Sequence, residues 1–151
     1  YRMQIYPFVF LLHVLAATVW TGGHLVLAFT VLPRALQARD PQILLAFEAR
    51  FERIGMPALV VQVVSGLWLA HTLVPDVAAW FAASSPPARL IAFKLLLLVV
   101  TVLTALDARL RIIPRLSAQT LPALARRVYL VTVVSVLFVL VGVSFRGGLL
   151  A

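Results

Sequence analysis

Residues 90–106 read LIAFKLLLLVVTVLTAL, an apolar run in which Lys94 is the only charged side chain. A helix needs about 20 consecutive, mostly apolar residues to cross the hydrocarbon core of a bilayer. Three further runs of this kind occur in the chain. The sequence therefore predicts an all-α integral membrane four-helix bundle, a single membrane domain over residues 1–151, with spans at about 5–32, 56–74, 90–106 and 128–145.

The composition of the whole chain fits a membrane protein and argues against a soluble one. Of its 151 residues, 63% are hydrophobic and 12% are charged, and the mean hydropathy is +1.06. Soluble domains are about half apolar and about a quarter charged. We assign the formal net charge of +8 to arginines that meet lipid headgroups, so no nucleic-acid partner is expected. The absence of cysteine from the sequence excludes disulfides, zinc–thiolate sites, iron–sulfur clusters and covalently attached haem.

Arginines are concentrated on one side of the predicted membrane. The connections at 33–55 and 107–127 carry most of them, whereas the other side has only Arg2, Arg89 and Arg146. Cytoplasmic loops of membrane proteins are enriched in Lys and Arg. We therefore expect a multi-pass protein of a bacterial inner (plasma) membrane, with both termini on the periplasmic side. The first apolar run is too long for a cleavable signal peptide, and none is expected.

The connection after the first span contains a further predicted helix. Residues 40–55, DPQILLAFEARFERIG, place Asp40 at an N-cap position and Pro41 at the first helical position. Apolar residues recur there at helical spacing, with charged residues between them. We expect a short amphipathic helix in the first cytoplasmic loop, between a first span that ends at Pro33 and a second span that begins near Met56.

Two histidines lie inside the first span, at the ends of the stretch HVLAATVWTGGH, residues 13–24. At about 100° per residue, His13, Ala17, Trp20 and His24 fall on one side of the helix and form a stripe of small and polar residues. Such a stripe faces protein rather than lipid. An ionisable side chain within a span usually marks a functional site, so the stripe is a candidate site.

Polar side chains from three spans share one predicted depth. Counting about 1.5 Å per residue from the span midpoints places His13, His71 and Lys94 about 6–7 Å to the outer side of the bilayer centre. His24 comes out about 9 Å to the inner side. No acidic residue lies within a predicted span, so Lys94 has no carboxylate partner from this chain at its depth.

Haem b fits this combination, because its iron binds imidazole nitrogens and its two propionates need cations. We predict a haem b site in the outer half of the bundle, with iron ligands from His13 and His71. His24 is a candidate metal ligand for a second haem, with its axial partner from another copy of the chain. The alternative is that His71 and Lys94 extend toward the outer surface and the others only pack. The remaining cofactor-binding residues predicted for the first haem are Lys94, Arg89 and Trp20.

Longer stretches resemble a known family. LHVLAATVWTGGHLVLAFTVLP resembles the first helix of the copper-resistance protein D (CopD) family, with its leucine–histidine pair, tryptophan and paired glycines. VVSGLWLAHTLV and ARLIAFKLLLLVVTVLTALDARLRIIPRL resemble the next two helices of that family. FERIGMPALVVQVVSGLWL also resembles the four-helix protoporphyrinogen oxidase family called HemJ, whose members are thought to bind haem b. The stretch from Trp20 to Pro33 is longer here than in HemJ.

The name of the CopD family implies copper as an alternative cofactor or cargo. Copper(I) prefers thiolate and thioether ligands, and the sequence offers only Met3 and Met56, which we expect on opposite sides of the membrane. We therefore expect electron transfer through haem b, with a quinone or a redox protein as partner and lipids around the bundle. The alternatives are a copper transport or tolerance protein, a protoporphyrinogen oxidase, and a cofactor-free subunit of a larger membrane complex or homo-oligomer.

Overall fold

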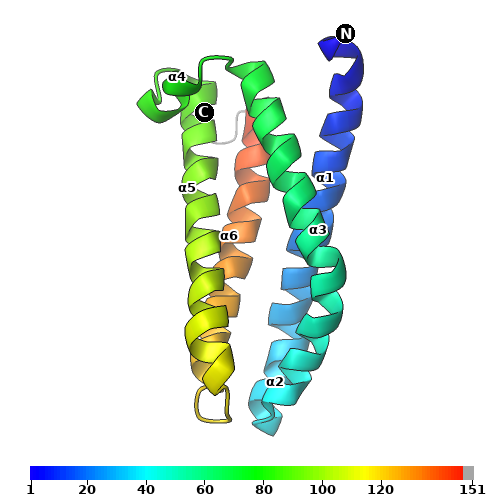
Figure 1. Cartoon of the computed structure of the whole chain (residues 1–151), viewed down its shortest axis with the longest axis vertical. Coiled ribbons are helices and arrows are strands. Elements are labelled where there is room, and N and C mark those ends of the chain that lie inside the picture. Colours follow the sequence, from blue (N-terminus) through cyan, green and yellow to red (C-terminus); the bar gives the residue numbers. More distant parts are fainter. Residues whose placement is uncertain (148–151) are drawn as a thin grey trace.

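The computed structural model describes residues 1–147, which form four long antiparallel helical rods and no strand (Figure 1). Each rod is long and apolar enough to cross a membrane. The predicted all-α membrane bundle is therefore confirmed, and the chain is a multi-pass membrane protein. The elements are α1 (Arg2–Val26), η1 (Leu27–Val31), α2 (Leu32–Ala38), α3 (Pro41–Leu73), α4 (Val77–Ala82), α5 (Pro86–Asp107), η2 (Ala108–Ile112), η3 (Ile113–Arg115) and α6 (Leu121–Gly147).

The first rod does not end at Pro33 as expected from the sequence. It continues to Ala38 because the five residues before Leu32 form a π-helical turn, η1. A proline inside an α-helix removes one hydrogen bond and clashes with the preceding turn, and a π turn provides the extra residue that relieves this crowding. The third rod repeats the arrangement, since the π turn η2 precedes Pro114 by two residues.

The helix predicted after Asp40 is present, but it is not separate from the second span. Asp40 accepts a hydrogen bond from the Gln42 N–H at 3.0 Å, and Pro41 begins α3, as predicted. The helix then runs without a break through Pro57 to Leu73, a length of 33 residues. Such a helix is about 50 Å long, so its charged first turns extend beyond the roughly 30 Å hydrocarbon core.

The four rods pack as two helical hairpins. The first rod packs along α3, and α5 packs along α6, while the hairpins meet chiefly where α1 lies beside α6. At one end of the bundle a cluster of buried residues from both hairpins joins them. Its members are Leu27, Leu32, Ala35, Leu44, Ile112, Leu121, Leu124 and Ala125.

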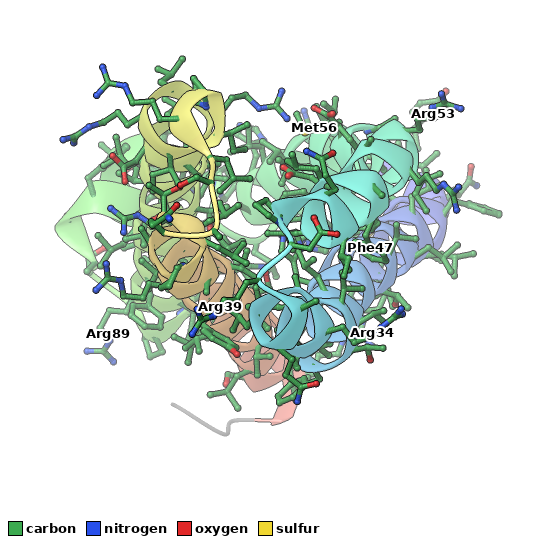
Figure 2. The ribbon with its side chains drawn as sticks, turned by 90° about the horizontal axis from the view of Figure 1, so that it is seen from below. Arg34, Arg39, Phe47, Arg53, Met56 and Arg89 are labelled. Carbon is green, nitrogen blue, oxygen red and sulfur yellow. The ribbon has the colours of Figure 1, made fainter. Side chains whose placement is uncertain are left out.

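The two ends of the bundle differ in charge. Tyr1, the short helix α4 and the end of α6 lie at one end, which we call the termini end (Figure 1). Figure 2 looks at the opposite, arginine-rich end, where α2 and the start of α3 lie and where Arg34, Arg39 and Arg53 are labelled. This end is defined by Arg34, Arg39, Arg50, Arg53, Arg109, Arg111, Arg115, Arg126 and Arg127.

Candidate functional site

His13 is held between α1 and α3 by hydrogen bonds from one ring nitrogen. Its Nδ1 lies 3.0 Å from the Gln62 carbonyl oxygen and 2.9 Å from the Ser65 hydroxyl. A carbonyl oxygen can only accept, so Nδ1 carries the proton. In the neutral imidazole, Nε2 then carries the lone pair that a metal ion requires.

A glycine on α3 makes room for this imidazole. A Cβ atom at Gly66 would lie 3.1 Å from the His13 Cε1 atom, which is closer than ordinary van der Waals contact. The ring therefore rests against the backbone of α3. The sequence alone did not pair Gly66 or Ser65 with His13.

His24 repeats the same hydrogen-bonding pattern about three turns further along α1. Its Nδ1 donates to the Trp20 carbonyl oxygen at 2.8 Å, so Nε2 is again free to act as a ligand. The ring packs on Trp20, with centroids 4.4 Å apart, and meets the edge of Phe51 at 5.7 Å. Phe51 fits there because Gly23 has no side chain, and a Cβ at Gly23 would overlap its ring.

Two buried oxygen atoms on the facing helices lack a hydrogen-bond partner within the described part of the chain. They are Gln62 Oε1 on α3 and Thr21 Oγ1 on α1. The Gln62 backbone binds the His13 ring, and Thr21 precedes His24 by three residues, on the same side of α1. Unsatisfied polar atoms are uncommon inside proteins, so this part of the first hairpin has free capacity for a polar ligand.

A groove of about 330 Å³ opens beside His24, where α3 and α5 separate. We call it the α3–α5 groove and define it by six of its lining residues. Most of its lining is apolar, but it also contains two carboxylates, two arginines and a thioether. The defining residues are Trp20, His24, Glu48, Met56, Thr101 and Arg109.

Lys94 faces the interior of the bundle from α5. Its Nζ lies against α6, 6.0 Å from the centre of the Phe138 ring. Within residues 1–147, no carboxylate lies within ion-pairing distance of Lys94. The structure places Lys94 beside α6, and a site shared with His13 stays a prediction.

His71 and Arg89 lie further from His13 than the sequence predicted. His71 is five residues beyond Gly66 on α3, about 7.5 Å further toward the termini end. Arg89 is exposed at the start of α5, and its side chain extends away from the bundle axis (Figure 2). The shared depth of His13 and His71 came from counting along separate spans, and the actual register of α1 against α3 offsets the two residues.

The histidines are not part of a dense metal cluster. Among residues 1–147, no three His, Cys, Asp or Glu side chains are grouped closely enough to hold a metal ion. Sequence reasoning found both interior histidines but missed the unpaired Gln62 oxygen, although Gln62 and Ser65 are polar residues three apart in an apolar helix. That spacing places both on one side of α3 and was the available signal.

Comparison with known proteins identifies the family. No curated protein and no solved structure matches the chain. The family model described as copper resistance protein D, CopD, matches residues 45–145. The match contains Met56, His71 and Lys94 and begins after His13 and His24. Because it covers most of the chain, it agrees with the resemblance noted in the helices, and the chain belongs to the CopD family.

Proposed function

We propose that this protein binds copper inside the membrane and moves it between the two sides, and that it thereby contributes to copper tolerance. The observation that carries the proposal is the state of His13. Its Nδ1 is bound to the Gln62 carbonyl oxygen, which leaves Nε2 as a free ligand atom inside the first hairpin. Membership of the copper resistance protein D family supports copper as the ion.

The hydrogen bonds of His13 are those that metal-binding histidines usually have. An imidazole that ligates a metal almost always donates its other N–H to a carbonyl, a carboxylate or water, which fixes the ring and makes the ligating nitrogen more basic. Imidazole is a suitable copper ligand. The Ser65 hydroxyl, at 2.9 Å from Nδ1, further fixes the ring.

The unpaired oxygens support movement of the ion as well as binding. His13 and His24 are eleven residues apart on α1, about 16 Å along the helix. Gln62 Oε1 and Thr21 Oγ1 are buried at intermediate levels and lack partners within residues 1–147. In this proposal, a copper ion that leaves His13 passes these polar atoms on its way to His24.

Electron transfer through haem b is the second candidate function, and Lys94 is the observation that favours it. This ammonium group faces the bundle interior and has no carboxylate partner in the described residues, so a haem propionate would neutralise it. When bound, haem would supply one-electron redox chemistry. His13 would hold the iron and Lys94 a propionate.

One experiment separates the two candidates. The protein is purified in detergent from cells supplied with both copper and haem, and its metal content and its oxidised and dithionite-reduced optical spectra are recorded. We expect copper in a defined ratio to protein, no Soret band, and loss of the copper held at His13 in His13→Gln. The matched variant His71→Gln should keep it, because His71 lies outside the His13 contacts.

The other outcomes reject the copper proposal in different ways. A Soret band with an alpha band that sharpens on reduction would establish haem b. Absence of both copper and haem would favour a cofactor-free subunit. In cells, His13→Gln should lower copper tolerance to the level of a strain that lacks the protein.

A further inference from the structure

We propose that the α3–α5 groove is a copper(I) site in which His24 Nε2 and the Met56 thioether are the ligands. The inference rests on the proposed function for the identity of the ion, but it concerns residues outside the His13 contacts. In this groove an imidazole and a thioether line the same cavity. This juxtaposition is the basis of the proposal.

The His24 ring is fixed before any ion arrives. The Trp20 carbonyl oxygen accepts from Nδ1 at 2.8 Å, and the ring is packed between Trp20 and Phe51. A ligand whose orientation is already set loses little freedom on binding, which raises affinity. The close approach of Phe51 to Gly23 holds this arrangement in place.

The second proposed ligand, the Met56 thioether, is a soft donor, and it therefore favours copper(I) over copper(II). Thioether sulfur favours copper(I), and imidazole binds copper well. Met56 follows Gly55 on the groove wall of α3 and is 45% exposed, whereas Met3, the other methionine, is 83% exposed at the termini end.

Charged residues lie at the arginine-rich side of the groove. Glu48 and Glu52, one turn apart on α3, both line it, and Glu52 forms an ion pair with Arg109 of η2. This pair links α3 to the second hairpin where the helices otherwise separate. Arg127 also lines the groove, so its two carboxylates are balanced by two guanidinium groups.

Selenium spectroscopy tests the sulfur ligand directly. The full chain is produced with selenomethionine, purified in detergent and loaded anaerobically with copper(I) and ascorbate. X-ray absorption at the selenium edge then reports whether copper is bonded to selenium. We expect a copper shell in the wild type and in Met3→Leu, and no copper shell in Met56→Leu or His24→Phe.

Competition with a copper(I) chelator gives a second readout. Met56→Leu should weaken copper(I) binding at this site by at least about tenfold, while Met3→Leu leaves it unchanged. Circular dichroism and gel filtration of each variant establish that the helices and the monodisperse state are retained. The His13→Gln variant should keep the selenium–copper shell, since His13 is not part of the groove.

Each remaining result has a distinct meaning. If the wild type binds copper(I) but shows no selenium–copper shell, the groove inference is wrong and the function proposed through His13 stands. If the wild type binds no copper(I), the proposed function fails together with the groove site. If a lipid acyl chain occupies the groove, the wild type shows no selenium–copper shell, and mass spectrometry detects the bound lipid.

Discussion

Two glycines determine how closely the functional side chains approach the helices. Gly66 allows the His13 ring to lie against the backbone of α3, and Gly23 allows Phe51 to reach His24. Small residues at helix contacts are common in membranes because they let helices pack tightly. In this protein the space at each glycine is filled by an aromatic ring from the facing helix.

Replacing Gly66 with alanine should disturb the His13 site. A methyl group there would lie 3.1 Å from His13 Cε1, so the ring must move and its Nδ1 hydrogen bonds must weaken. We expect copper binding through His13 to fall by about tenfold or more, with little change in helix content. Equilibrium dialysis followed by metal analysis measures this effect.

Gly22→Ala is the matched control for that substitution, since a Cβ at Gly22 meets nothing within 4 Å. Alanine is favoured over glycine inside helices, so this variant should be more stable by about 0.5–1 kcal/mol and should bind copper normally. Equal copper affinity in the two alanine variants would contradict the role assigned to Gly66.

The positions of the interior histidines were predictable from the sequence, but their partners on the facing helix were not. His13 and His24 could be placed on one interior stripe because helical periodicity fixes relative angles within one helix. The partners of His13 on α3 could not be found in this way, because they depend on the register between two helices. That register placed His13 beside Gln62 and Ser65 rather than beside His71.

The helices begin and bend at residues whose backbone chemistry requires it. Asp40, Asp76 and Ser85 each cap the first turn of a helix by accepting a backbone N–H. Pro33 and Pro114 each follow a π turn by two residues. The same local solution therefore lets two rods extend past the point where each apolar run ends.

Removing the Asp40 cap should destabilise the protein measurably. In Asp40→Ala the Gln42 N–H loses its side-chain acceptor, and we expect the free energy of unfolding in detergent to fall by about 1 kcal/mol. Thermal or denaturant unfolding followed by circular dichroism measures the change. Asp76→Ala removes the equivalent cap of the six-residue helix α4 and provides a comparison at the other end of the bundle.

At the scale of elements, capping signals were predictable and helix ends were not. Asp40 and Pro41 correctly marked the start of a helix, since that signal is contained in a few adjacent residues. Pro33 was wrongly taken as an end because an inserted π turn depends on the surrounding packing rather than on the proline itself. For the same reason, α3 was divided at Met56 although it is continuous.

For the whole molecule, the difference in charge between the two ends predicts its orientation. All nine arginines of the arginine-rich end lie opposite the termini, which matches the excess of positive charge in cytoplasmic loops. We therefore predict that the termini end, including α4, faces away from the cytoplasm.

The absence of cysteine from the sequence makes this orientation easy to test. Phe81→Cys introduces a thiol at an α4 side chain that is 76% exposed, and Arg39→Cys introduces one at the arginine-rich end. In intact cells or spheroplasts, a membrane-impermeant maleimide should label the first variant and reach the second only after permeabilisation. The reverse pattern would place the arginines outside.

The architecture was the most predictable level, because four long apolar runs and an unequal distribution of arginine are properties of the whole sequence. The two-hairpin arrangement and the separation of α3 from α5 were not predictable, since apolar helices of similar length can pair in several ways. Only the side chains at each contact decide between these pairings.

Because the hairpins are joined along α1 and α6, α3 depends on few contacts to stay in place beside the second hairpin. The two hairpins are in contact along α1 and α6, whereas α3 and α5 make few contacts with each other. Within residues 1–147, the Glu52–Arg109 ion pair is the one side-chain hydrogen bond that joins α3 to the second hairpin. The buried cluster that includes Leu44 of α3 also joins the hairpins at the arginine-rich end, so α3 is held there by packing as well as by this ion pair.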